Sequence, residues 1–358
     1  MNSWKECKLG DVAEINMGQS PKSEFYNQDK IGLPFLQGNR TFGLKYPYFD
    51  TYCSEPTKIA KHGEILFSVR APVGDINIAN DEICIGRGLC SINSKDKNNE
   101  FLYYLLHFLK NEIINNESGS VFGSINRTDL SNINVLYPPI EEQKAIAEIL
   151  SSLDDKIDLL HRQNQTLESL AQTLFRQWFI EEAKEEWEIG TFNDLVEVSS
   201  GKSLKRELFD DTGKYEVLGA NGKIGKTNEW LFEEKLIYTG RVGTLGKVFL
   251  IDEVKKVWLS DNTLIIKPKR YFYFIYFLMI EFNFEEFNVG STQPLIRQSD
   301  LKNIEILLPN DKLILKFEEQ AKDIFIKINK NKKQIQTLEN LRDTLLPKLL
   351  SGEVRVEI

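Results

Sequence analysis

The feature that most constrains this chain of 358 residues is an internal repeat. Near the start, Trp4 and Gly18 recur 183 positions later as Trp187 and Gly201. Farther along each half the separation is 171, and the matched pairs there include Gly119 with Gly290, Asp129 with Asp300, Pro138 with Pro309 and Leu167 with Leu338. A repeat of this length is a duplicated domain plus a duplicated helix rather than a solenoid unit. The sequence therefore predicts two similar but non-identical domains that perform related tasks.

Composition places the chain among globular proteins, since 41% of its residues are hydrophobic and 11% aromatic. The first residues contain no apolar run, so no signal peptide is expected. The most hydrophobic stretch, residues 271–282, is interrupted by Glu281 and is too short to cross a bilayer. All four cysteines lie in the first half and have no counterparts in the second. A disulfide framework would have been duplicated with the domain, so we expect a reduced, cytoplasmic protein without membrane contact.

Charge and metal-ligand patterns narrow the function further. The three histidines, His62, His107 and His161, are scattered and no C-x-x-C pair exists, so no metal site is predicted. The net charge is −8, and most of this acidity falls in residues 141–186. An acidic chain argues against diffuse nucleic-acid binding. It leaves room for a focused basic face or for a partner that supplies positive charge.

Two long helices are predicted from heptad patterns. The core positions of the first, in residues 141–179, are Leu150, Ile157, Asn164, Ala171 and Trp178 together with Leu153, Leu160, Leu167 and Leu174; those of the second, in residues 317–350, include Phe317, Ala321, Ile324, Ile328, Asn331, Ile335, Leu338, Arg342, Leu345 and Leu349. Each helix can run about 50 Å at 1.5 Å per residue. The alternative is that each helix packs only on its own domain, but a sustained heptad favours a seam between the two. An antiparallel seam can place Asn164 opposite Asn331, where a buried amide pair would fix the register.

Around these helices each copy is predicted to be a mixed α/β domain with long polar loops. Short strands are expected at 12–15, 133–136, 195–198 and 304–307, and hydrophobic helices at 101–110 and 272–282. The glycines of residues 240–246 fit neither the G-x-G-x-x-G nor the G-x-x-x-x-G-K-[ST] spacing of nucleotide-binding loops. Turns between strands are therefore favoured over phosphate binding. The predicted fold class is mixed α/β, with two domains separated by two long helices in an antiparallel coiled coil and an internal pseudo-twofold repeat. The predicted domains are 1–140 and 187–311, and the helical segments are 141–186 and 312–358.

The polar loops carry side chains suited to DNA. Arginine pairs with guanine and Asn or Gln with adenine, whereas lysine more often holds phosphate. Arg70 with Arg241, and Asn126 with Arg297, stand out because the repeat places them at equivalent positions, although any single member can simply be a solvated loop residue. The candidates are Gln37, Asn39, Arg40, Arg70, Arg87, Asn126 and Arg127 in the first copy and Lys205, Arg206, Asn221, Lys223, Lys226, Arg241, Gln293, Arg297 and Gln298 in the second.

Motifs of a DNA-modifying enzyme are missing. Tyr137-Pro138-Pro139-Ile140 has Tyr where a flipped adenine requires an amide or an acid. No Walker A lysine exists. The acidic-x-Lys triplet within Asp252–Lys255, which occurs in nucleases, is expected by chance because 27% of the residues are charged. The chain is therefore predicted to be non-catalytic and to bind no cofactor.

Three segments in combination carry a family resemblance: PPIEEQKAIAEIL (138–150), FRQWF (175–179) and LLPKLLSGEVRV (345–356). Over essentially its whole length the chain resembles the DNA specificity subunit of type I restriction–modification systems. The resemblance implies two target-recognition domains, each reading one half of a bipartite site in double-stranded DNA, and paired helices that set the unspecified spacer. It also implies two modification subunits, which carry the S-adenosylmethionine-dependent adenine methyltransferase, and translocating restriction subunits.

The second proline-rich junction, residues 308–312, departs from this family pattern, and Glu318-Glu319-Gln320 lies later than the matching motif of the first copy. The aromatic end of the first helix, Phe175, Trp178 and Phe179, fits either a docking surface for the modification subunit or the closure of the spacer core. Two other functions stay open. One is a stand-alone DNA-modifying enzyme, and the other is a coiled-coil interaction protein without a DNA role.

Overall fold

The computed structural model describes residues 4–115, 123–243, 245–290 and 294–357. The chain forms two compact units, one built from Met1–Leu159 with Gln334–Ile358 and the other from Leu160–Lys333. Each unit thus contains one α/β domain and part of both long helices. The domain boundaries predicted from the sequence treat each long helix as a separate segment, and they remain a prediction.

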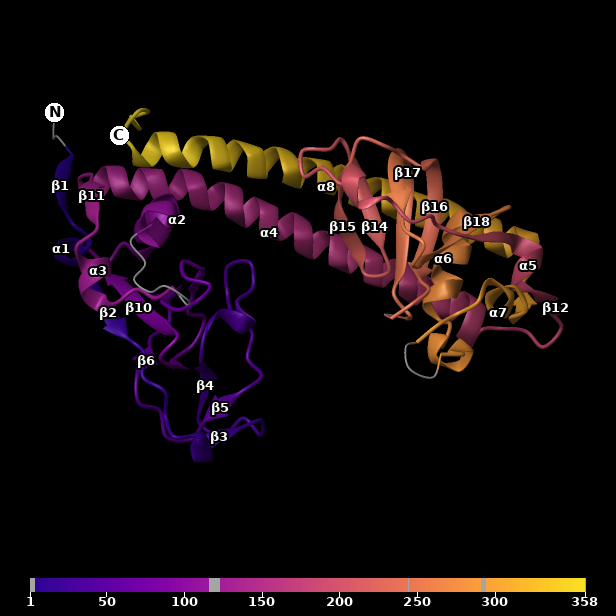
Figure 1. Cartoon of the computed structure of the whole chain (residues 1–358), viewed down its shortest axis with the longest axis horizontal. Helices are drawn as coiled ribbons and strands as arrows, with labels where there is room; N and C mark the ends of the chain where they lie inside the picture. Colours follow the sequence, from indigo (N-terminus) through magenta and orange to yellow (C-terminus); the bar gives the residue numbers. More distant parts are fainter. Residues whose placement is uncertain (1–3, 116–122, 244, 291–293, 358) are drawn as a thin grey trace. The chain divides into compact units, whose positions relative to one another are not determined.

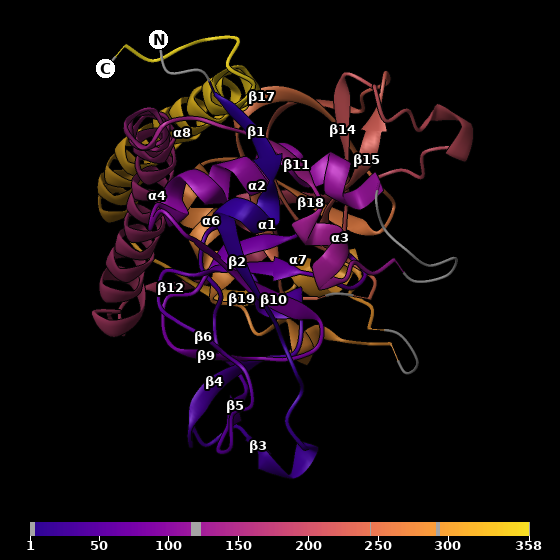
Figure 2. The same cartoon turned by 90° about the vertical axis from the view of Figure 1, so that its left-hand side faces the viewer.

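The first unit is built on a four-stranded antiparallel sheet with the order β2-β10-β7-β8. The strands are β2 (Ala13–Met17), β7 (Ile65–Ser68), β8 (Ile76–Ile78) and β10 (Leu89–Ser94). The hydrophobic helix α2 (Asn99–Asn115) buries Phe101, Leu102 and Leu105 in the core beneath this sheet. Beside the sheet, β1 (Lys5–Lys8) pairs with β11 (Asn134–Tyr137), and Figure 2 shows this ribbon next to the short helices α1 (Leu9–Val12) and α3 (Arg127–Ser131).

A second sheet in the first unit supports the polar loops. Its order is β3-β5-β4-β9-β6, with β3 (Tyr26–Asn27), β4 (Leu33–Leu36), β5 (Tyr52–Cys53), β6 (Ile59–Ala60) and β9 (Ile83–Ile85). Leu36, Ile83 and Ile85 are buried in a small core of their own. These strands are two to four residues long and were not predicted, because so short a run carries no visible alternation.

The second unit has a six-stranded sheet with the order β13-β18-β16-β17-β14-β15. Its strands are β13 (Val196–Ser200), β14 (Tyr215–Gly219), β15 (Gly222–Thr227), β16 (Phe232–Gly240), β17 (Val248–Leu259) and β18 (Thr263–Pro268). Only the β14–β17 pair is parallel among the strands described in this sheet. A separate ribbon joins β12 (Glu188–Thr191) to β19 (Glu305–Leu308), and α5 (Phe192–Leu195) and α7 (Gln298–Lys302) match α1 and α3 of the first unit.

The hydrophobic helix α6 (Phe272–Ile280) of the second unit is capped by a residue far away in the sequence. The carboxylate of Glu318 accepts a hydrogen bond from the backbone N–H of Phe274 at 2.6 Å. Burial raises the pKa of Glu318 to about 7, although the backbone N–H groups at the helix start favour the charged form. Glu318 therefore works inside the unit, holding α6 against the long helix that follows.

Both long helices are continuous, α4 over Ile140–Arg176 and α8 over Asp311–Leu350, and they run side by side in antiparallel directions within each unit (Figure 1). In the first unit Arg342 pairs with Asp154 at 2.9 Å. In the second, Asn331 Nδ2 donates to Asn164 Oδ1 at 2.9 Å, and both side chains are buried. The predicted seam and its amide pair are therefore confirmed.

The aromatic end of α4 belongs to the core of the second unit. Phe175 is buried, and so is Phe179, which lies in a single π-helical turn, Gln177–Glu181. The Phe179 ring lies 4.9 Å from that of Phe274, and the Phe175 ring lies 5.6 Å from that of Phe317. The interpretation of Phe175 and Phe179 as a docking surface is wrong, because these rings are enclosed by their own domain.

The last residues of the chain are bound to the first unit. The Arg355 guanidinium forms a two-pronged ion pair with Glu142, and Trp4 Nε1 donates to Glu142 Oε2 at 2.9 Å. The side chain of Glu142 is 4% exposed, and Arg355 also lies over the Trp4 ring. Gln143, the next residue of the first proline-rich motif, is buried and donates to the carbonyl of Pro138. This motif therefore joins Trp4, the residue before β1, to the start of α4 and to the tail.

One repeated glycine has a steric reason in both units. A side chain at Gly18 would overlap the carbonyl oxygen of Gly86, and one at Gly201 would overlap that of Ser260. Neither glycine needs an unusual φ, so the requirement is close backbone approach rather than conformational freedom. Within the described ranges, none of the helices combines the length and apolar character that a membrane span requires.

Candidate nucleic-acid interface

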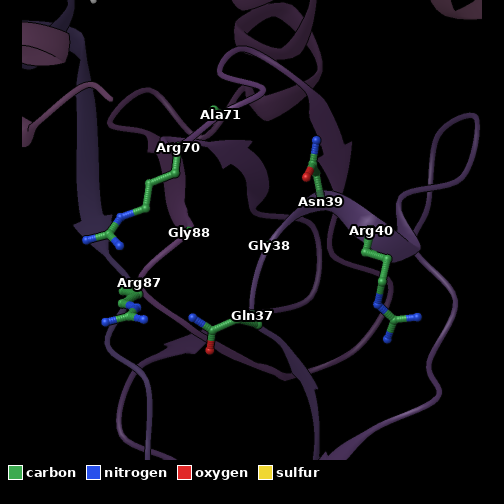
Figure 3. Close-up of a pocket in the computed structure, with 8 residues that line it drawn as sticks. All are labelled: Gln37, Gly38, Asn39, Arg40, Arg70, Ala71, Arg87 and Gly88. Carbon is green, nitrogen blue, oxygen red and sulfur yellow. The ribbon is translucent and has the colours of Figure 1, made fainter. Parts of the chain in front are cut away.

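Five of the seven candidates in the first copy line one hollow of about 340 Å³ (Figure 3). They come from three separate stretches of the first unit, because residues 37–40 are contiguous. Gln37 follows β4, Asn39 and Arg40 form a 3-10 turn (Asn39–Thr41), Arg70 follows β7, and Arg87 lies between β9 and β10. Gly38, Ala71 and Gly88 complete the lining. The sequence predicted the residues, and the structure brings them together.

The positive charge of this hollow comes from two of its three arginines. Arg40 pairs with Asp50 at 2.8 Å, and in Figure 3 its side chain points away from Gln37. Hydrogen bonds from Arg40 and from the Thr51 hydroxyl lower the pKa of Asp50. Arg70 and Arg87 are exposed, and neither forms an ion pair with any residue in the described ranges. Their guanidinium groups are thus available to an external acceptor.

Hydrogen bonds orient the two amides of the hollow. Ser20 Oγ donates to Gln37 Oε1 at 2.9 Å and accepts from the backbone N–H of Arg87 at 3.2 Å. Asn39 Nδ2 donates to Asp75 at 2.6 Å, which leaves its oxygen as the available atom. Ser20 was not among the predicted site residues, although it belongs to the repeat and could have been noticed there.

The other two candidates of the first copy lie on α3 and do not line this hollow. Asn126 caps that helix, since its Oδ1 accepts from the N–H groups of Thr128 and Asp129 at 2.8 and 3.0 Å. Arg127 is exposed on the first turn. The position of Asn126 has a structural reason, which its spacing to Asp129 signals in the sequence as a capping box.

In the second unit most of the cationic candidates lie on exposed loops and on β15. Lys205 pairs with Glu207 at 3.7 Å and Lys223 with Glu216 at 3.4 Å, while Arg206 is exposed and Lys226 half-buried. Asn221 is exposed in the turn between β14 and β15. Gln293 lies outside the described residues. Surface pairs of this kind leave the lysines accessible to phosphate.

Arg241 forms a distinct polar cluster with two neighbours. Its Nη1 donates to Ser200 Oγ at 3.4 Å, and Gln298 Nε2 donates to the same oxygen at 2.9 Å. Arg241 is half-buried, and its Nε is buried without a partner among the described residues. Ser200 ends β13, while Gln298 begins α7. This cluster orients Gln298 with its oxygen available, the reverse of Gln37.

Arg70 and Arg241 are not at equivalent positions, and this prediction is wrong. The N–H of Ile125 donates to the carbonyl of Val69, and in the second unit Ile296 donates in the same way to Arg241. The counterpart of Arg241 is therefore Val69. A one-residue shift turns a strand residue to the other face, which explains why Arg70 is exposed and Arg241 half-buried. Asn126 and Arg297 do correspond, because each is the N-cap residue of its short helix.

The acidic-x-Lys segment of β17 is occupied by structural contacts. Asp252 accepts from Asn329 Nδ2 at 2.6 Å, Glu253 pairs with Lys333 at 2.7 Å, and Lys255 pairs with Glu216 at 3.1 Å. In the described part of the chain no group of three or more His, Cys, Asp or Glu side chains could hold a metal ion. Asp252 and Glu253 attach α8 to β17, and Lys255 joins β17 to β14.

Comparison with known proteins places this architecture in a family. The family model described as type I restriction modification DNA specificity domain matches residues 1–169 and 184–340, and the chain belongs to this family. It is 28% identical to the type I restriction enzyme MjaIX specificity subunit of Methanocaldococcus jannaschii, over 99% of this chain and 94% of that protein. Over 46% of this chain and 40% of the relative, it is 44% identical to the putative type I restriction enzyme MjaX specificity subunit of the same organism.

The fold agrees with a solved structure of the same kind. The type I restriction–modification S subunit from M. genitalium matches 97% of this chain and 96% of that chain with a TM-score of 0.63 at 20% identity. The resemblance predicted from the motifs and the mixed α/β fold class are therefore confirmed. The chain is a specificity subunit, and its family ties it to recognition of DNA sequence within a type I restriction–modification complex.

Proposed function

We propose that this chain reads an asymmetric, bipartite target in double-stranded DNA, with one half-site contacted by each α/β domain. The observation that carries the proposal is the hollow of the first unit, where predicted DNA-contacting residues from three separate stretches converge. Two of them, Arg70 and Arg87, form no ion pair with any described residue. Arginine and amide side chains on loops are the groups that read base edges in the major groove. The chain itself performs no chemistry in this proposal.

The two half-sites differ because the two units place different side chains at matching positions. By strand register, Ser200 of the Arg241 cluster corresponds to Met17, and Arg241 corresponds to Val69. The cluster that orients Gln298 in the second unit thus has no polar counterpart in the first. Sequences read by such different surfaces are not copies of each other.

The long helices supply the spacer between the half-sites in this proposal. Each is a single uninterrupted helix of 37 or 40 residues, and the buried amide pair fixes their mutual register. Modification subunits, which would carry S-adenosylmethionine and the adenine methyltransferase, dock on this chain, and restriction subunits with translocase activity join the complex.

Mapping methylated adenines tests the reading function. The chain is co-expressed with its cognate modification subunits, and methylated sites are identified by sequencing the host DNA. Replacing Arg70 and Arg87 by Ala should relax or abolish recognition of one half-site only, and Arg241→Ala should affect only the other. Equal loss at both half-sites in both variants would contradict separate reading.

Matched insertions test the spacer. Seven residues, one heptad, are inserted between Thr166 and Leu167 and seven between Ile328 and Asn329, which lie opposite each other in the antiparallel seam. Each heptad adds about 10 Å of helix, so we expect the unspecified spacer to lengthen by about three base pairs at 3.4 Å each. An unchanged spacer, with methylation retained, would show that the helices do not set it.

A further inference from the structure

The amide of Gln37 is held in one orientation by its own domain. Ser20 Oγ accepts from the backbone N–H of Arg87, so its hydroxyl hydrogen is directed to Gln37 Oε1, 2.9 Å away. This bond fixes the orientation of the Gln37 amide, with its oxygen turned toward Ser20 and its Nε2 hydrogens available. Figure 3 shows the amide nitrogen of Gln37 on the side that faces Arg87.

The residues around Gln37 are also hydrogen-bond donors. Arg70 and Arg87 are exposed, and a guanidinium group contains hydrogen-bond donors but no acceptor atom. Of the described residues that line the hollow, none is acidic. Asn39 offers an oxygen, but its amide nitrogen is bound to Asp75, so its orientation is set independently of Gln37. The side of the hollow formed by Gln37, Arg70 and Arg87 therefore presents donors only.

Glutamine reads adenine by using both ends of its amide, with the oxygen accepting from N6 and the nitrogen donating to N7. That mode requires a Gln37 oxygen that faces the base. Here an adenine N6 amino group would meet the Nε2 amino group, donor against donor. Guanine instead presents O6 and N7, two adjacent acceptors, in the major groove. Thymine offers one acceptor beside a methyl group, which leaves the arginines unmatched.

We infer that the surface of Gln37, Arg70 and Arg87 reads a guanine in the half-site of the first domain, and that Ser20 is the positioning residue that excludes adenine there. The inference rests on the proposed function, since it assumes that this hollow faces DNA. It reverses the expectation that a glutamine in this loop selects adenine.

The test is a set of variants of the full chain, each co-expressed with the modification subunits and analysed by methylated-adenine mapping. Gln37→Glu keeps an oxygen for Ser20 but replaces the donors with an acceptor. We expect the guanine preference at one position to fall by tenfold to a hundredfold and cytosine, whose N4 donates, to become the preferred base there. Ser20→Ala frees the amide, so adenine should be accepted together with guanine, and Ser20→Thr, which keeps the hydroxyl, should restore the wild-type preference.

Gln19→Glu is the matched control, because it makes the same change one residue from Ser20 but outside the hollow lining. It should leave the target unchanged. The half-site of the second domain should stay constant in every variant, which shows that the chain is folded and active.

Three outcomes would overturn the inference. One is a wild-type half-site without guanine at any position that Gln37→Glu alters. Another is uniform loss of methylation without a change of base, which would mark the hollow as a phosphate clamp. The third is adenine exclusion that persists in Ser20→Ala. The proposed function fails differently, since the half-site would then stay the same even when Arg70 and Arg87 are both replaced by Ala.

Discussion

The buried pair of Asn164 and Asn331 allows a quantitative prediction about the helical seam. Asn331 is fully buried and Asn164 is 7% exposed. Their single hydrogen bond, 2.9 Å long, leaves Asn331 Oδ1 without a partner among the described residues. Replacing Asn331 alone by Leu, which branches at the same carbon, removes the donor and leaves Asn164 Oδ1 buried and unsatisfied. A lost partner of this kind costs about 1–3 kcal/mol.

Replacing both asparagines by Leu should be nearly neutral or stabilising. Both desolvation penalties disappear, including that of the unsatisfied Asn331 oxygen, and apolar contact replaces them. The double-mutant cycle should therefore show a coupling free energy of about 1–3 kcal/mol that favours the double variant over the sum of the single changes.

Urea unfolding monitored by tryptophan fluorescence measures this cycle. Four of the five tryptophans, Trp178, Trp187, Trp230 and Trp258, lie in the second unit with the asparagine pair. Gln165→Leu, at an exposed position beside Asn164, is the control and should change the free energy of unfolding by less than about 0.5 kcal/mol. Single variants as stable as wild type, or a double variant destabilised by the full sum, would refute the reasoning.

Three more predictions follow from the contacts within each unit. Because the pKa of Glu318 is raised to about 7, the folded state binds its proton more tightly than the unfolded state does, and the free energy of unfolding should fall as the pH rises from about 4.5 to about 7. Glu318→Gln should remove this slope and stabilise the second unit at pH 8 by about 1–3 kcal/mol in urea titrations, whereas an unchanged slope would assign it to another group. Arg355→Ala should destabilise the first unit by about 2 kcal/mol, since Glu142 would remain buried with only Trp4 as a donor. Faster hydrogen exchange of the β1 and β11 amides would report this loss. A change of exchange in the second unit alone would contradict the prediction. Gly18→Ala and Gly201→Ala should each lower the free energy of unfolding of the unit that contains them by about 1–3 kcal/mol, because a methyl group would overlap a backbone carbonyl. The same hydrogen-exchange experiment measures this change. Wild-type protection in either variant would show that the backbone moves to accept the methyl group.

The sequence was sufficient to predict the features that depend on local periodicity. The heptads of α4 and α8 are visible without any knowledge of distant contacts, and their polar interruptions at Asn164 and Asn331 already indicated the antiparallel register. The hydrophobic helices α2 and α6 were predicted from their apolar runs, which are also local features of the sequence. The strand order could not be predicted, because each strand chooses its partner by contacts far away in the sequence. In β17, the longest strand described, a run of charged residues interrupts the alternation of polar and apolar side chains by which a strand is recognised in a sequence.

The candidate site shows the same division. Residue type alone selected Gln37, Asn39, Arg40, Arg70 and Arg87, and the fold brings them to one hollow. The predicted equivalence of Arg70 and Arg241 was wrong because it rested on the identity of the two residues. The backbone hydrogen bonds show that the correct alignment differs by one position. The orientation of Gln37 was beyond prediction, since it depends on a hydroxyl 17 residues away in the sequence. The residue type of Gln37 therefore indicated hydrogen bonding to a base, whereas its neighbour Ser20 decides which end of the amide is presented.

The division of the chain into units has a consequence for its synthesis on the ribosome. The second unit is one continuous stretch, Leu160–Lys333, whereas the first also needs Gln334–Ile358, including the Arg355 that closes on Glu142. The domain translated first is thus the last to be completed, which reverses the usual order of folding during translation. A premature stop in the part of the final helix that follows Lys333 would leave the later-made unit whole and the earlier-made one incomplete, with the buried Glu142 carboxylate lacking its guanidinium.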